Sequence, residues 1–72
     1  MLTKKEQDII DLLRANPYMG NVRVAALLGK SESTIENQLR SIYAKLGFTG
    51  SAFAKRARLI DWARGVGEYK TV

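Results

Sequence analysis

Cysteine and histidine are both missing from the 72-residue sequence, and their absence removes most catalytic and metal chemistry. Without cysteine there is no disulfide, no thiolate zinc site and no cysteine nucleophile. Without histidine the commonest general base and the commonest metal ligand are gone as well. The pairs Asp8/Asp11 and Glu32/Glu36 have helical spacing, but no partner base or metal-ligand set accompanies them. We therefore expect no enzyme, no cofactor and no small-molecule substrate.

Long apolar stretches are also lacking. The longest apolar run is Val24–Leu28, far shorter than the ~18 residues that a membrane-spanning helix needs. Residues 1–5 are basic, but Glu6, Gln7 and Asp8 follow where a signal peptide would need an apolar segment. The sequence predicts a soluble intracellular protein with no membrane partner.

Acidic side chains are scarce in the second half of the chain. Residues 1–36 carry equal numbers of basic and acidic side chains, whereas residues 37–64 carry six basic side chains and Asp61 as their single acid. The net charge of +5 therefore comes from the second half. A positive field on one side of a protein favours a polyanionic partner such as nucleic acid. The alternative is an ordinary solvated surface with lysine and arginine to spare.

Two helices are expected in the first half of the chain. Thr3-Lys4-Lys5-Glu6 fits a capping box that begins the first helix. Asn16-Pro17 ends it, because the residue before a proline is disfavoured in the helical region. A second, short helix is expected from Asn21, a possible cap, to Leu28. Gly29 then supplies the backbone freedom that a tight turn needs.

The third expected helix spans residues 32–46, between a Ser31 cap and Gly47. At about 100° per residue, one narrow face of this helix is apolar and comprises Ile35, Leu39, Ile42 and Leu46. The opposite side lacks large apolar residues and comprises Ser33, Asn37, Arg40, Ser41 and Ala44. Glu36 lies on one flank, with Gln38 and Lys45 on the other.

The fourth helix is expected from about Ala52 to Arg64, and it has two apolar sectors. Phe53, Ala57 and Ile60 form a stripe that we expect to face the core. A second sector points well away from the first and comprises Ala52, Leu59, Trp62 and Ala63. A short helix of this kind exposes one sector for an interface or packs it on the first helix or the tail. Gly65-Val66-Gly67 is expected to end the helix, giving one domain at 1–65 and a loose tail at 66–72.

The second and third helices have the spacing of a helix-turn-helix. Ala25 is small where the two helices would cross, and Gly29 is free to adopt a positive φ between them. Ile35 and Leu39 anchor the third helix on the core and leave its far face bare, as insertion into the DNA major groove requires. Many αα-corners share this spacing, so the spacing alone leaves the assignment open.

Four motifs favour a helix-turn-helix over other αα-corners. They are Leu2-Thr3-x-x-Glu6, Val24-Ala25-x-x-Leu28, Ser31-x-x-Thr34-Ile35 and Ile42-x-x-Lys45-Leu46-Gly47. Their order resembles the LuxR/GerE-type helix-turn-helix, the C-terminal domain of many bacterial response regulators and quorum-sensing regulators, over about residues 2–63. The resemblance implies an all-α, four-helix DNA-binding domain in the bacterial cytoplasm, associated with the nucleoid. It also implies that residues 32–46 form the recognition helix and that the fourth helix makes the dimer contact.

Candidate DNA contacts follow from the bare face and from the resemblance. Asn37 suits adenine and Arg40 suits guanine, unless both simply belong to a solvated helix face. Ser31, Ser33 and Thr34 are caps, phosphate donors or both. Lys45 matches a lysine of the family and is expected to contact phosphate. The full set comprises Lys30, Ser31, Ser33, Thr34, Glu36, Asn37, Arg40, Ser41 and Lys45. Weaker candidates for phosphate neutralisation are Lys55, Arg56 and Arg58.

Two positions depart from the family pattern. Glu36 stands where a basic residue is usual, and it either accepts a hydrogen bond from a cytosine amino group or pairs with Arg40. Gln38 stands where histidine is usual, as a polar residue at the rim of the core.

Two functions are compatible with these patterns. The first is a stand-alone, sequence-specific transcriptional regulator that binds double-stranded DNA as a homodimer, with no receiver or ligand-sensing domain. The second is a protein-interaction module in which Glu36 has weakened DNA binding. In that case the apolar fourth helix docks another transcription regulator or RNA polymerase.

Overall fold

The computed structural model describes residues 2–69, and it describes side chains for residues 2–65. It contains four helices: α1 (Lys4–Ala15), α2 (Asn21–Leu28), α3 (Glu32–Leu46) and α4 (Ala52–Tyr69). No strand occurs within this part of the chain, so the expected all-α fold class is confirmed.

The predicted start and end of α1 are confirmed. The Glu6 amide donates to Thr3 Oγ1 at 3.2 Å, and the Thr3 amide donates to Glu6 Oε1 at 2.8 Å. These two bonds satisfy amides that a helix N-terminus otherwise leaves without partners. The helix ends at Ala15, and Asn16 is its C-cap immediately before Pro17.

The cap of α2 differs from the expectation. Gly20 is the N-cap and offers no side-chain hydrogen bond, so Asn21 is the first helical residue rather than the cap. The side-chain oxygen of Asn21 instead accepts a hydrogen bond from Arg56 in α4. A tertiary partner has therefore taken the atom that a local cap would have used.

The turn between α2 and α3 is built as the sequence indicated. Gly29 has φ of 67°, in the left-handed region, and the Lys30 amide donates to Ala25 O at 2.9 Å. At the start of α3, Ser31 Oγ accepts from the Thr34 amide at 3.1 Å. Glycine is favoured at such a position because the left-handed conformation is strained for residues with a Cβ atom.

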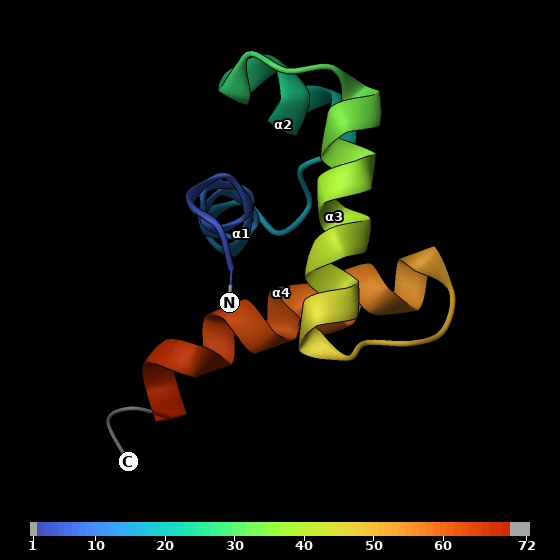
Figure 1. Cartoon of the computed structure of the whole chain (residues 1–72). Coiled ribbons are helices and arrows are strands. Elements are labelled where there is room, and N and C mark those ends of the chain that lie inside the picture. Colours follow the sequence, from blue (N-terminus) through green and yellow to red (C-terminus); the bar gives the residue numbers. More distant parts are fainter. Residues whose placement is uncertain (1, 70–72) are drawn as a thin grey trace.

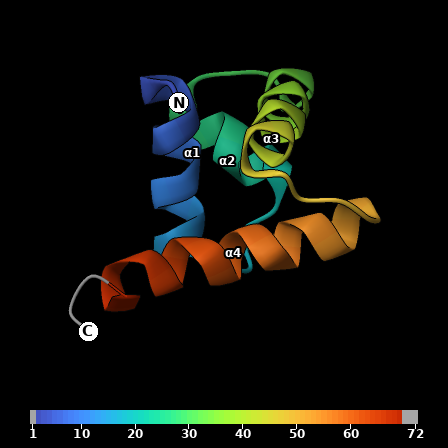
Figure 2. The same cartoon turned by 60° about the horizontal axis from the view of Figure 1, so that its bottom comes forward.

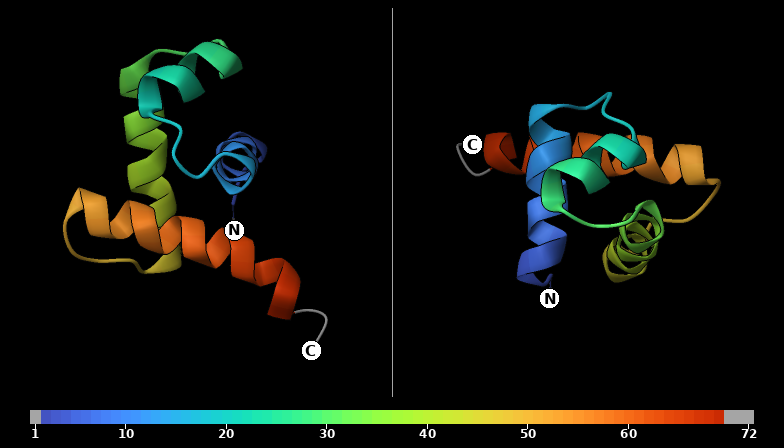
Figure 3. Two further views of the ribbon diagram at one scale, coloured as in Figure 1. Left: turned by 180° about the vertical axis from the view of Figure 1, so that it is seen from behind. Right: turned by 90° about the horizontal axis from the view of Figure 1, so that it is seen from above.

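The four helices enclose one small core (Figure 1). α3 stands upright in this view, α1 is seen nearly along its axis, and α4 crosses the base. Figure 2 shows α1 and α4 crossing each other, and Figure 3 shows α2 and the α1–α2 connection from the opposite side. α2 packs on α3, while α1 packs on both α3 and α4. The fully buried side chains are Ile9, Leu13, Val24, Ile35, Ile42 and Leu59.

The expected end of α4 is wrong. The helix continues past Arg64 and through Gly65 and Gly67 to Tyr69, and residues 70–72 of the expected tail lie outside the described residues. An isolated glycine inside a helix costs only about 1 kcal/mol relative to alanine, so glycines alone do not end a helix.

The expectation that the Phe53 stripe faces the core is also wrong, and the second sector follows the alternative in which it packs on the first helix. Leu59 and Ala63 of that sector are buried in the core, with Trp62 half-buried beside them. Phe53, assigned to the core, is 84% exposed, and Ala57 is exposed as well. Periodicity identifies two apolar stripes on a helix, but the position of the neighbouring helices decides which stripe they cover.

Candidate nucleic-acid interface

The outward face of α3 carries the side chains that were predicted to contact bases. Ser33, Glu36, Asn37 and Arg40 are all exposed there, while Ile35, Leu39 and Ile42 on the opposite face are buried. Ser33 is three and four residues from Glu36 and Asn37, and these are four and three residues from Arg40, so the four side chains line one strip of the helix. We call this set the α3 outer face.

Asn37 and Arg40 are neighbours on this face. Arg40 Nη1 lies 3.5 Å from Asn37 Oδ1, a weak contact between two groups suited to base edges. The alternative pairing of Glu36 with Arg40 is not formed: within residues 2–65 the two ion pairs are Lys4–Asp8 and Lys45–Glu6. The Glu36 carboxylate is therefore exposed on the α3 outer face without a cation bound to it in the described part of the chain.

The hydroxyls at the start of α3 divide into two kinds. Ser31 Oγ accepts from the Thr34 amide, and the Ser31 and Thr34 hydroxyls are linked at 2.9 Å, so both serve as caps. Ser33 is exposed beside them and takes no part in this network. Lys30, in the turn, is half-buried.

Lys45 and Ser41 point to an internal partner rather than to the α3 outer face. Lys45 Nζ donates to Glu6 Oε1 at 2.7 Å, linking the end of α3 to the start of α1. The Lys45 hydrogen bond lowers the pKa of Glu6 to about 2, helped by the Thr3 amide and by Ser41 and opposed by burial. No local pattern predicts this pair, because its members are 39 residues apart.

The basic side chains of α4 are also engaged. Arg56 donates to Asn21 Oδ1 and to the Met19 carbonyl, and so ties α4 to the α1–α2 connection. Lys55 Nζ lies 5.4 Å from the centroid of the Tyr43 ring, a cation–π distance. Burial raises the pKa of the Tyr43 hydroxyl, although the charge of Arg56 opposes this, so the hydroxyl stays protonated at neutral pH.

Arg58 makes a similar contact, with its guanidinium carbon 5.3 Å from the Phe48 ring centroid. The three residues expected only to neutralise phosphates therefore also hold α4 in place.

Gln38 is half-buried at the rim of the core, where it was expected. Its Oε1 atom is fully enclosed and has no hydrogen-bond partner in the structure. An unsatisfied buried acceptor costs roughly 1–3 kcal/mol, so glutamine is a poor fit at this position.

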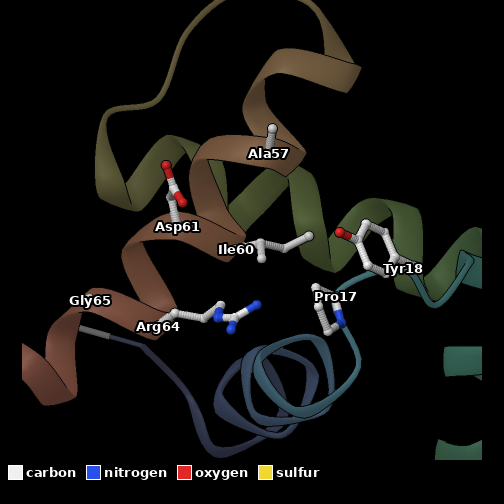
Figure 4. Close-up of a pocket in the computed structure, with 7 residues that line it drawn as sticks. All are labelled: Pro17, Tyr18, Ala57, Ile60, Asp61, Arg64 and Gly65. Atoms are coloured by element: carbon white, nitrogen blue, oxygen red, sulfur yellow. The ribbon is translucent and has the colours of Figure 1, made fainter.

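The exposed apolar surface of α4 is not the sector that was predicted as the dimer contact. Of Ala52, Leu59, Trp62 and Ala63, only Ala52 is exposed. The exposed surface consists instead of Phe53, Ala57 and Tyr18, which is 99% exposed, with the half-buried Ile60 beside them. Figure 4 shows the adjoining cleft, where Ile60 and Arg64 point towards Tyr18 and Pro17 and Asp61 points away. We call Tyr18, Phe53, Ala57 and Ile60 the α4 apolar face.

Two features are absent from the described residues. No group of three or more acidic side chains is gathered there to hold a metal ion. None of the helices in that part of the chain is long and apolar enough to cross a membrane. Comparison with known protein families, curated proteins and solved structures gave no significant match.

Proposed function

We propose that the protein is a sequence-specific regulator of transcription that binds double-stranded DNA. In this proposal α2, the Gly29 turn and α3 form a helix-turn-helix, and α3 enters the major groove as the recognition helix. The observation that carries the proposal is the α3 outer face, where Ser33, Asn37 and Arg40 are exposed while the apolar side of α3 is buried. The excess of positive charge in residues 37–64 supports a polyanionic partner.

Asn37, with its side-chain amide, and Arg40, with its guanidinium, would recognise the base sequence. Asn37 has the donor and acceptor pair that adenine requires, and Arg40 has the fork that matches the two acceptors of guanine. Because they adjoin each other on α3, they would contact neighbouring base pairs. Glu36 would accept from a cytosine amino group in the same groove. Ser33 would donate to a phosphate at the groove edge.

Dimerisation is part of this proposal, through the α4 apolar face. Tyr18 and Phe53 project from this surface, and Pro17, Ala57 and Ile60 line hollows beside them. A two-fold interface needs such self-complementarity, because each copy contributes the same patch. A dimer would present two recognition helices to two half-sites.

The direct test is recovery and sequencing of bacterial DNA fragments bound by the purified protein at near-physiological salt. Enrichment of a short repeated half-site is the expected result. Arg40→Ala should lower affinity for the enriched site by about tenfold or more and relax the preference at one base pair. The matched control is Arg14→Ala, an exposed arginine in the last turn of α1, which should leave the preference unchanged. DNA recovered without any preference by the wild-type protein would refute sequence-specific binding.

The second candidate function is a protein-interaction module that docks another transcription regulator or RNA polymerase. The exposure of Tyr18 and Phe53, 99% and 84%, favours it. Here DNA binding would be weakened, and Phe53→Ser should abolish a complex with a bacterial regulator that Arg40→Ala leaves intact. Light scattering of the isolated protein separates the cases: a dimer that Phe53→Ser converts to a monomer supports self-association through the α4 apolar face.

A further inference from the structure

A small cleft adjoins the α3 outer face on the side of α4. It has a volume of about 260 Å³ and lies between the start of α2, the middle of α3 and the start of α4. Its walls are formed by Asn21, Glu36, Leu39, Arg40, Tyr43, Ala52 and Lys55. Because Glu36 and Arg40 belong to both surfaces, a molecule bound along α3 would pass over the cleft. The α3–α4 connection, visible at the lower right of Figure 1, brings the start of α4 to this position.

Positive charge converges on the cleft. Arg40 and Lys55 line it directly, and the Arg56 guanidinium is held behind it on Asn21. The first residues of two helices, Asn21 of α2 and Ala52 of α4, also line it. The N-terminal end of a helix carries a partial positive charge, so both helices add to the field of the side chains. The Glu36 carboxylate at the rim is the one negative group among the lining residues.

The Tyr43 side chain supplies a second, independent indication of a ligand. The residue is only 7% exposed, yet its hydroxyl has no hydrogen-bond partner within the described part of the chain. The hydroxyl is not fully enclosed by protein. Among the described residues, Gln38 Oε1 is the one fully enclosed side-chain polar atom that lacks a hydrogen-bond partner, so the unpartnered Tyr43 hydroxyl must be open to solvent. Tyr43 is one of the residues that line the cleft, and its hydroxyl has no partner in the described chain that would compete with a ligand. A protonated donor beside two cations suits an anion with several oxygen acceptors.

We infer that this cleft binds one phosphate of the DNA backbone, with Lys55 as the cation that pairs with it and Tyr43 as the hydrogen-bond donor; Arg40, whose guanidinium is assigned to guanine, adds only its positive field. The inference rests on the proposed DNA binding and adds a contact outside the recognition helix. The phosphate would lie towards Lys55 and Tyr43, away from the Glu36 carboxylate. Binding there would fix the depth and direction of α3 in the groove, because phosphate contacts position a protein on the duplex.

The test is fluorescence anisotropy with a DNA duplex over a series of KCl concentrations. Each phosphate neutralised contributes about 0.9 to the slope of log K against log salt concentration, so Lys55→Gln should reduce the slope by about 0.9. Lys55→Arg keeps the charge and should keep the slope. Lys5→Gln, an exposed lysine on α1 that is not part of the cleft, is the matched control and should leave the slope unchanged.

Tyr43→Phe separates the hydrogen bond from the charge. It should weaken binding about fivefold and leave the salt slope unchanged, because a neutral donor releases no counterion. Circular dichroism melts of each variant establish that the fold is retained. Wild-type binding with equal slopes for Lys55→Gln and Lys5→Gln would overturn the phosphate site while leaving the proposed function standing. Absence of DNA binding by the wild-type protein would overturn both.

Discussion

The buried ion pair between Glu6 and Lys45 gives a prediction whose size follows from the structure. Glu6 is 4% exposed, and its carboxylate accepts from Lys45 Nζ and from the Thr3 amide. These bonds lower its pKa from 4.5 to about 2. One pKa unit corresponds to about 1.4 kcal/mol. The shift of Glu6 therefore means that the folded state favours the charged carboxylate over the neutral carboxyl by at most roughly 3 kcal/mol. Since the Lys45 side chain is 34% exposed, solvent screening should reduce this to about 2 kcal/mol.

Removal of the charge should therefore destabilise the fold at neutral pH. Glu6→Gln keeps the shape of the side chain, and we expect it to lower the free energy of unfolding at pH 7 by about 2 kcal/mol. The measurement is urea denaturation followed by the fluorescence of Trp62. The matched control is Asp8→Asn, which removes the exposed partner of Lys4 and should cost less than about 0.5 kcal/mol.

The pH dependence provides the stricter test. A carboxyl with a lowered pKa in the folded state stabilises the protein above its unfolded pKa, and that stability is lost as pH falls towards the folded pKa. For Glu6 the loss falls between about pH 5 and pH 2. The wild-type protein should lose stability over this range more steeply than Glu6→Gln. Equal destabilisation by Glu6→Gln and Asp8→Asn, or parallel pH profiles for wild type and Glu6→Gln, would refute the assignment of a strong buried pair.

Three further predictions concern packing, an unsatisfied atom and the proposed DNA-binding face. Leu59→Ala should lower the free energy of unfolding by about 3 kcal/mol, because Leu59 is fully buried; a loss below 1 kcal/mol would place this part of α4 outside the core. Gln38→Met should raise it by about 1 kcal/mol by removing a buried acceptor without a partner, which thermal denaturation would show as a higher Tm. Glu36→Lys should tighten binding to non-specific DNA and steepen its salt dependence, whereas unchanged affinity in a filter-binding assay would mean that Glu36 does not lie near DNA. The control is Glu32→Lys, an exposed residue one turn earlier on α3. It changes the net charge by the same amount, so any difference between the two variants measures the effect of position.

Some features of the candidate site follow from local sequence patterns, and others depend on tertiary contacts. The α3 outer face was predictable, because 3.6-residue periodicity places Ser33, Asn37 and Arg40 opposite the buried Ile35 and Leu39. The partners of the charged residues were not. Lys45 and Ser41 share a helix with the outer face, yet they turn to Glu6 on α1. Nothing local in the sequence specifies a partner 39 residues away.

Local signals in the sequence specify the ends of the first three helices, apart from the N-cap of α2. The Thr3/Glu6 capping box, Pro17, Gly29 and the Ser31 cap act over one turn of chain, so their effects can be predicted without knowledge of the rest of the molecule. Each of these signals satisfies or removes backbone hydrogen bonds within a few residues of itself. The prediction of four helices and no strands in the described chain held for that reason.

The orientation of α4 depends instead on how the helices pack against one another. Its two apolar stripes are similar in the sequence, and the approach of α1 buries Leu59 and Ala63 while Phe53 and Ala57 remain in solvent. The same docking brings Arg56 to Asn21, Lys55 to Tyr43 and the start of α4 to the cleft beside Arg40. Burial and ion pairing depend on which surfaces meet, and that is a property of the packed helices rather than of any one of them.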